Sequence, residues 1–207
     1  MAQPKPKWRR RKEARPGEIV AAALGVFAER GFAAARTDDI ARRAGVSKGV
    51  IYLYFETKQD LFRAVVREAV APNIAVVEAA IAGVDLPFSS TARVMLNVLT
   101  EVMTTTQLGS VAKMVIAESG NFPDLALIWH EDVVSRALGL ATGLIEKAQA
   151  KGEVRPGDPR IHAFSLVGPV LTGVLWREVF APVGVAPFDL KAIAEQHIET
   201  ALEGLIP

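Results

Sequence analysis

The chain has 207 residues, half of them apolar, and contains no cysteine. This length allows one large domain or a small domain joined to a larger one, and the lack of cysteine excludes disulfides and thiolate metal sites. The formal net charge is only +1, but residues 1–60 carry 13 Lys and Arg against 7 Asp and Glu, whereas the remainder carries 11 against 16. A basic N-terminal part on an acidic body predicts a polyanionic partner for one end of the molecule.

Helical periodicity runs along nearly the whole sequence, and no alternation of apolar and polar residues indicates a strand. Residues 1–15 are basic and polar and predict a disordered arm. A first helix is expected to open near Pro16 and to end at Gly31, a residue type that favours helix C-termini. A short second helix follows, with Thr37 as its predicted N-cap and Gly45 just past its end.

Ser47 predicts the cap of a third short helix that runs to about Tyr54. Thr57 and Asp60 have the spacing of a capping box and predict the start of a fourth helix, which Pro72 should kink or end. Beyond this point the pattern predicts a larger helical domain whose breaks are marked by glycine and proline. Its further predicted helices cover residues 90–107, 108–119, 123–151, 159–180 and 188–204.

The third predicted helix has an uncommon division of its two faces. On an ideal helix Ile51 and Tyr54 face the core, whereas Lys48, Gly49 and Tyr52 share the opposite side. Two short helices joined by a tight glycine-containing turn form a helix-turn-helix, whose second helix enters the major groove of DNA. The sequence therefore predicts a DNA-binding domain over residues 16–62.

The residues on the outward face suit contacts with DNA. Lys48 can reach a guanine edge or a phosphate, Tyr52 can donate its hydroxyl to a phosphate, and Gly49 lets the backbone come close. Thr37 lies at a helix N-terminus, where unpaired amides attract phosphate. A solvated surface charge is the alternative for Lys48 and for Lys58. The predicted DNA contacts are Thr37, Ser47, Lys48, Gly49, Tyr52, Leu53 and Lys58.

A longer spaced pattern surrounds this motif, consisting of Gly31-Phe32, Thr37, Ile40-Ala41, the run from Ala44 to Gly49, Ile51-Tyr52, Tyr54-Phe55, Lys58 and Leu61. The pattern resembles the N-terminal domain of the TetR family of bacterial transcriptional regulators. The resemblance implies an all-α fold with a three-helix N-terminal domain. It also implies a helical C-terminal domain, over residues 63–207, that binds a small molecule and dimerises through its last two long helices. Leu53 stands where a polar residue would read a base, so it either contacts a thymine methyl or packs.

Methionine and aromatic residues recur through the C-terminal part, with few polar groups near them. At helical spacing they fit an ordinary core, and together they also predict a pocket for a small apolar or aromatic molecule. The predicted pocket residues are Met95, Met103, Met114, Phe122, Trp129, Phe164 and Trp176. The histidines are too far apart in sequence to predict a metal site, and no cofactor is expected.

The stretch 161–176 is apolar nearly all round its helix. It is shorter than the roughly 20 residues of a membrane span, and a helix of this kind must be buried on several sides. Packing the last two helices against a second copy would make a four-helix interface and present two reading heads to a palindromic operator. The predicted interface residues are Phe164, Gly168, Leu171, Leu175, Ile193, Ile198, Ala201 and Leu202.

No nucleophile–base pair, metal cluster or phosphate-cradling loop indicates an enzyme. We expect a cytoplasmic homodimeric regulator without membrane association, most simply a repressor of double-stranded operator DNA. A small-molecule effector would release it by shifting the helix that begins at Thr57, with a coupling that weakens DNA binding about 5–150-fold. Activation in place of repression stays open, and a helical interaction module without sequence-specific DNA binding is the alternative function.

Overall fold

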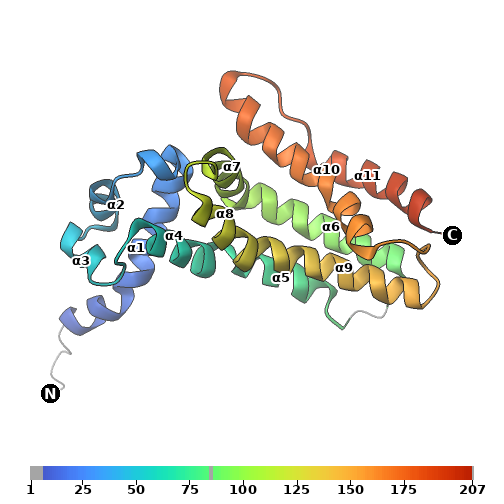
Figure 1. Cartoon of the computed structure of the whole chain (residues 1–207), viewed down its shortest axis with the longest axis horizontal. Helices are drawn as coiled ribbons and strands as arrows, with labels where there is room; N and C mark the ends of the chain where they lie inside the picture. The colour runs from blue at the N-terminus through green and yellow to red at the C-terminus, as the bar shows by residue number, and fades with distance from the viewer. Residues whose placement is uncertain (1–6, 84–85, 207) are drawn as a thin grey trace, which may run out of the picture.

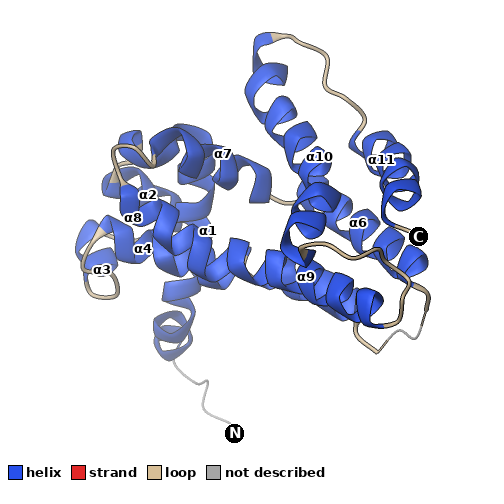
Figure 2. Cartoon of the chain, turned by 45° about the vertical axis from the view of Figure 1, so that its right-hand side comes forward, coloured by secondary structure: helices blue, strands red, loops and turns tan. Residues whose placement is uncertain are grey.

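The computed structural model describes residues 7–83 and 86–206. The described residues form eleven α-helices and contain no β-strand, which confirms the all-α prediction. Helices α1–α4 form a small head at one end of an elongated body made of α5–α11 (Figure 1). The connections between the helices are loops and turns (Figure 2).

The head is built on three phenylalanines without solvent exposure. Phe27, Phe32 and Phe62 have ring centroids 5.5–5.9 Å apart, an arrangement that aromatic pairs favour. The rings come from α1 and α4, so they join the first and last helices of the head. The head helices are α1 (Lys7–Ala34), α2 (Thr37–Ala44), α3 (Lys48–Tyr52) and α4 (Lys58–Val65).

The first helix is longer than the sequence predicts. It begins at Lys7 with Pro16 inside it, so residues 7–15 of the predicted arm are helical instead of disordered. This stretch contains no Gly or Pro and is rich in Lys, Arg, Ala and Glu, which are good helix formers. Residues 1–6 of the predicted arm lie outside the described residues. At the other end Gly31 leaves the helical conformation at φ 78°, as predicted.

The short helices of the head start and stop close to the predicted positions. Thr37 is the first residue of α2 and not its cap, because the extended residue before it is Arg36, whose side chain makes no cap hydrogen bond. Gly45 ends α2 in the left-handed region at φ 66°, where glycine carries no steric penalty. Thr57 and Asp60 form the predicted capping box at the start of α4.

The third helix ends at Tyr52, two residues before the predicted end. Tyr54 therefore lies in the turn that follows. Its side chain is 39% exposed, and its ring centroid lies 6.4 Å from that of Phe55. The prediction that Tyr54 faces the core is wrong, since the helix on which it rested does not continue that far.

The body contains two π-helical turns that interrupt predicted continuous helices. The turn η1 (Val66–Val70) follows α4, and η2 (His130–Val134) separates α8 from α9. The two turns contact each other, and the Arg67 Nε atom lies 3.1 and 3.0 Å from the two carboxylate oxygens of Asp132. The body helices are α5 (Pro72–Ile81), α6 (Phe88–Thr105), α7 (Leu108–Glu118), α8 (Pro123–Trp129), α9 (Ser135–Ala150), α10 (Pro159–Phe180) and α11 (Leu190–Leu205).

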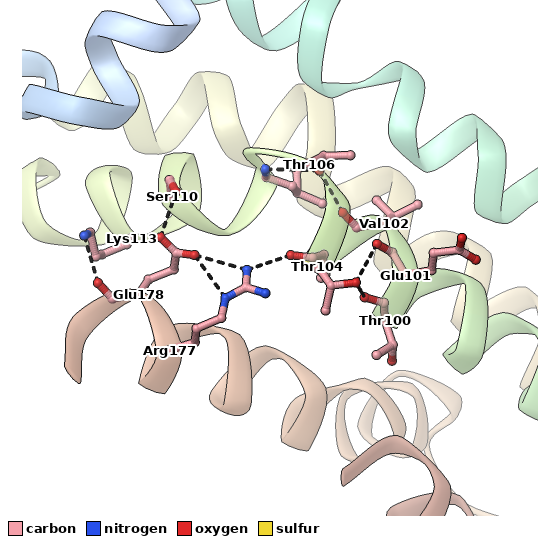
Figure 3. Close-up of polar contacts among 11 residues, drawn as sticks. Thr100, Glu101, Val102, Thr104, Thr106, Ser110, Lys113, Arg177 and Glu178 are labelled. Carbon is pink, nitrogen blue, oxygen red and sulfur yellow. Dashed lines mark hydrogen bonds and ion pairs between the residues drawn. The ribbon is translucent and has the colours of Figure 1, made fainter. Parts of the chain in front are cut away.

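The last two helices pack on α6 and α7 but also extend away from them. The end of α10 and the loop leading to α11 project beyond the rest of the body (Figures 1 and 2). A polar network ties this end of α10 to the body: Ser110 Oγ donates to the Glu178 carboxylate at 2.7 Å, and Lys113 Nζ donates to the Glu178 carbonyl at 2.9 Å (Figure 3). Arg177 adds a hydrogen bond of 2.8 Å to the carbonyl of Met103.

Two helical glycines of the body should respond oppositely to alanine. A Cβ at Gly143 would meet nothing within 4 Å, whereas a Cβ at Gly173 would lie 2.6 Å from Leu190 Cδ2 and 2.9 Å from Ile193 Cδ1. We expect Gly143→Ala to stabilise the protein by about 0.5–1 kcal/mol and to raise Tm by about 1–4 °C. Gly173→Ala should cost about 1–3 kcal/mol through overpacking. Thermal unfolding followed by circular dichroism measures both, and equal shifts of one sign would contradict the packing described.

Candidate nucleic-acid interface

Helix α3 and the residues that flank it present an exposed surface. Ile51 points inward with 2% exposure, whereas Tyr52 is 49% and Leu53 is 80% exposed. Ser47, Lys48 and Gly49 lie beside them and are also exposed. We call these five exposed residues, Ser47, Lys48, Gly49, Tyr52 and Leu53, the α3 surface.

Lys48 is held on the α3 surface by an ion pair. Its Nζ atom donates to the carboxylate of Asp38 on α2 at 3.0 Å, and both side chains are about half exposed. The hydrogen bond and the negative charge of Asp38 raise the pKa of Lys48, so the ammonium stays charged at neutral pH. An ammonium has three N–H donors, and an outside acceptor can bind without the pair first separating.

Gly49 is not required by packing within the chain. A Cβ at this position would meet only Ser47 Oγ, at 3.9 Å. The missing side chain therefore leaves room outside the head, which suits close approach of a second molecule. The N-cap residue Ser47 makes no side-chain cap hydrogen bond, so its exposed hydroxyl is not engaged at the helix start. Thr37 is half-buried at the first position of α2.

Lys58 lies elsewhere and has a structural role. Its Nζ atom donates to the carbonyls of Phe32 at 2.7 Å, Ala33 at 3.3 Å and Ala35 at 3.2 Å, which uses its three donors. Burial lowers the pKa of Lys58, opposed by the negative charge of Glu118. The prediction of a phosphate contact at Lys58 does not fit this geometry, because carbonyls at the end of α1 need donors and take them from this lysine.

Sequence reasoning assigned no role to the arginines of α2. Arg36, Arg42 and Arg43 are exposed around this helix. Arg43 pairs with Glu29 at 2.6 Å, and Arg42 lies 3.3 Å from Asp39. The excess of basic residues in 1–60 indicated that this part of the chain could bind a polyanion. A charge count, however, does not predict on which face of a helix an arginine lies.

The residues predicted to line a ligand pocket lie partly in the core and partly in a surface groove. Met95, Met103 and Met114 are buried in the core, and Phe122 packs on Phe32 with ring centroids 5.1 Å apart. Trp129 is half-buried. The remaining two, Phe164 and Trp176, line a groove of about 530 Å³ on the surface of α10 and α11. A ligand contact stays a prediction for the other five residues, because core and pocket methionines have the same helical spacing.

Two larger hollows lie in other parts of the body. One of about 630 Å³ lies between α5, α6 and α9, and its lining includes three leucines and four charged residues: Leu86, Leu140, Leu144, Glu78, Lys147, Lys151 and Glu153. The other, of about 770 Å³, lies between α6, the end of α10 and the start of α11 and is lined mainly by polar residues. The first combines apolar walls with a few charges, which is typical of ligand sites.

The residues predicted for a dimer interface divide into two groups. Phe164 is 68% exposed, and Leu171 is exposed beside it. By contrast, Ile198 and Leu202 are buried within the chain, where α11 packs on α6; their assignment to an intermolecular face is wrong because α11 uses that side for its own body. The half-buried members are Gly168, Leu175, Ile193 and Ala201.

Within the described residues no group of three or more His, Cys, Asp and Glu side chains is placed to hold a metal ion. One segment, Pro159–Val183, is long and apolar enough to cross a membrane by length and composition alone. A helix at an interface of a water-soluble protein can have the same length and the same apolar composition.

A basic helix-turn-helix head on an all-helical body with hollows defines a DNA-binding transcriptional regulator. Residues 19–65 match the sequence profile of bacterial regulatory proteins of the tetR family. Residues 93–203 match that of the C-terminal domain of AefR-like transcriptional repressors. The chain belongs to the TetR family.

Sequence relatives match over only a short part of the chain. The HTH-type transcriptional activator FasR of Mycolicibacterium smegmatis is 46% identical over 59 residues, which is 28% of this chain and 27% of FasR. The fatty acid metabolism regulator protein of Bacillus subtilis is 41% identical over 59 residues, 28% of this chain and 30% of that protein. The matches thus span less than a third of these relatives.

Solved structures share the whole fold. FadR of Bacillus subtilis in complex with stearoyl-CoA superposes with a TM-score of 0.75 at 22% identity, over 91% of this chain and 98% of that one. FadR of Bacillus halodurans, a fatty acid degradation regulator, gives 0.74 at 23% identity over 97% of both chains. A TetR-family regulator from Mesorhizobium loti gives 0.75 at 22% identity over 98% and 100%.

Proposed function

We propose that this protein is a repressor that binds a palindromic operator as a homodimer and leaves it when an effector fills the body. The observation that carries the proposal is the α3 surface. There the ammonium of Lys48 and the phenol of Tyr52 are exposed on one helix with Gly49, a glycine that packing within the chain does not require. Repression is favoured over activation by the match of more than half of the chain to a repressor C-terminal domain, whereas the match to an activator covers 28%.

The dimer would form through the exposed apolar face of α10 and α11. Phe164 and Trp176 line the groove on this face, and exposed apolar patches of this kind mark interaction sites. A membrane is a poorer occupant, because Arg177 and Glu178 anchor the same helix to α6 and α7 through hydrogen bonds (Figure 3). A second copy would bury the face and place two heads on successive major grooves.

The effector would occupy the hollow between α5, α6 and α9. Gly139 and Gly143 line it, and a Cβ at either would meet nothing within 4 Å, so both glycines keep space open at a cost in helix propensity. Lys147 in the lining suits an anionic group, since Glu78 lies 3.8 Å from Arg136 and Glu153 accepts from the amide of Phe88, while the leucines suit a chain of methylenes. Together with the stearoyl-CoA complex of the similarly folded Bacillus subtilis FadR, this favours an acyl-chain effector over an aromatic one.

Selection of bound sequences from random DNA tests the proposal, with stearoyl-CoA or a flavonoid added in parallel arms. We expect a palindrome to be enriched and stearoyl-CoA to weaken its binding about 5–150-fold. Enrichment without symmetry would contradict the homodimer. Release by the flavonoid alone would favour the aromatic effector of the sequence prediction.

Filling the hollow should separate effector binding from DNA binding. We expect Gly143→Leu to weaken stearoyl-CoA binding by about tenfold or more, because its side chain takes the space of several methylenes worth about 0.8 kcal/mol each. Operator affinity without effector should stay within about twofold, since the residue lies in the body. Isothermal titration calorimetry with the Gly143→Ala variant as control measures the first quantity. Unchanged stearoyl-CoA affinity would place the effector elsewhere.

A further inference from the structure

A four-residue segment, residues 32–35, lies between the head and the body and is held from two sides. It joins the break of α1 at Gly31 to Arg36, whose carbonyl accepts from the amides of Asp39 and Ile40 in α2. Any displacement of this segment therefore moves the start of α2. We call residues 32–35 the α1–α2 link.

The amide side of the link is held by the body. Glu118, the last residue of α7, accepts hydrogen bonds from the backbone N–H of Phe32 at 2.8 Å and of Ala33 at 2.6 Å. Gly31 makes this approach possible, because a Cβ there would lie 2.3 Å from Glu118 Oε1 and the residue has φ +78°. A carboxylate on two amides is a charge-assisted contact, stronger than a neutral hydrogen bond.

The carbonyl side of the link is held by α4. Lys58 donates to the carbonyls of Phe32, Ala33 and Ala35 and lies 4.4 Å from the centroid of the Phe32 ring. Glu118 and Lys58 thus both bind the peptide group between Phe32 and Ala33, Glu118 through its N–H and Lys58 through its carbonyl. One comes from the body and the other from the helix that carries the head into η1.

A second polar attachment joins α4 to the body. Arg63 of α4 lies 3.6 Å from Glu131 of η2, and directly after α4 Arg67 of η1 pairs with Asp132 of η2. Helix α1 also packs on α7, and α4 packs on α8, so several contacts set the angle of the head on the body, and the Glu118 contact is the polar one at the α1–α2 link. The apolar contact of Phe32 with Phe122 remains when the polar grip is removed, so loss of Glu118 should loosen the angle and leave both cores packed.

We propose that Glu118 and Lys58 are positioning residues. By binding the α1–α2 link they set the distance and the angle between the two reading heads of the dimer. This geometry determines which spacing of half-sites the dimer selects. This proposal rests on the proposed function, because it requires a homodimer on a palindrome. Half-sites lie about 34–36 Å apart along the duplex. Inserting one base pair adds about 3.4 Å and about 34° of rotation, which a rigid pair of heads does not accommodate.

The experiment compares the palindrome selected by the wild-type protein with the same palindrome carrying one inserted base pair, and with a single half-site. For the wild type we expect the insertion to weaken binding about tenfold or more, and for Glu118→Ala less than about threefold. Lys58→Met should behave like Glu118→Ala. Glu146→Gln, which changes an exposed carboxylate of α9, is the matched control and should keep the wild-type penalty.

The half-site arm separates positioning from a merely structural role. Glu118→Ala should bind the single half-site within about twofold of the wild type, since it leaves the α3 surface unchanged. An equal loss of affinity for all three DNAs, or a full spacing penalty in Glu118→Ala, would overturn the proposal. Glu118→Gln, which keeps the side-chain shape, replaces Glu118→Ala if the latter unfolds. If the wild type selects no palindrome, the proposed function fails instead.

Discussion

Lys48→Ala is expected to weaken operator binding about 30-fold to 10⁴-fold while the protein stays folded. A good contact to a base or phosphate is worth about 1–3 kcal/mol, a dimer loses it twice, and each 1.4 kcal/mol is a factor of ten. The fold should hold because the Lys48–Asp38 pair is exposed, and exposed pairs contribute about 0–1 kcal/mol. Fluorescence anisotropy with labelled operator measures the affinity, and circular dichroism checks the fold.

Asp38→Asn is the matched control, since it breaks the same ion pair and leaves the ammonium in place. We expect it to bind the operator as tightly as the wild type or more tightly, because a negative charge near the phosphates is removed. If Asp38→Asn lost as much affinity as Lys48→Ala, the pair would serve to brace α2 against α3 and Lys48 would not contact DNA.

The salt dependence then separates the two contacts that the sequence leaves open for Lys48. Each phosphate contact contributes about one to the slope of log affinity against log salt concentration. A phosphate contact at Lys48 should therefore lower the slope by about two for the dimer in Lys48→Ala. A contact with a guanine edge should lower the affinity with a smaller change in slope and relax the base preference at one position of each half-site.

Local signals in the sequence were sufficient for the helix-turn-helix. The left-handed turn at Gly45 and the capping box of Thr57 with Asp60 depend on residues at most four apart, and both are present as predicted. The end of α3 was misplaced because the turn after Tyr52 consists of Leu53, Tyr54 and Phe55, whose apolar and aromatic side chains continue the pattern of a helix. These errors shift boundaries by one or two residues and leave the α3 surface intact.

The sequence pattern did not predict contacts between residues that lie far apart in the chain. Lys58 looked like a phosphate ligand, but its partners are carbonyls 23 to 26 residues earlier in the chain. Similarly, Glu118 had no distinguishing pattern, since the amides it accepts from are 85 and 86 residues away. Periodicity reports that a helix has an apolar side, but the choice between core, pocket and partner depends on which elements the fold brings to that side.

Helix α11 illustrates that choice. Its apolar residues occur on more than one side, which favoured an interface with a second copy at Ile198 and Leu202. In the structure these two residues are buried within the chain, where α11 packs on α6 and α10. The exposed apolar area lies instead on α10, around Phe164. We therefore expect a second copy of the chain to pack mainly on this helix.

Phe164→Asp is expected to convert the dimer into a monomer at micromolar concentration. The side chain is 68% exposed in the single chain and lines the apolar groove of α10 and α11, so a partner would desolvate an aspartate placed there without offering it a counter-charge. Ile116→Asp is the matched control, because Ile116 is 63% exposed on α7, outside the proposed interface, and should leave the assembly unchanged. Sedimentation velocity measures the mass of each variant.

The same substitution should reduce operator affinity about 100-fold or more without touching the α3 surface. Linking two heads makes the second binding event intramolecular, which raises the affinity about 10²–10⁴-fold. A monomer loses this gain in affinity but keeps its contact with a single half-site. The affinity for an isolated half-site should therefore match that of Ile116→Asp. A monomeric Phe164→Asp that bound the full palindrome as tightly as the wild type would mean that the two heads act independently. The spacing selectivity assigned to Glu118 and Lys58 would then have no dimer through which to act.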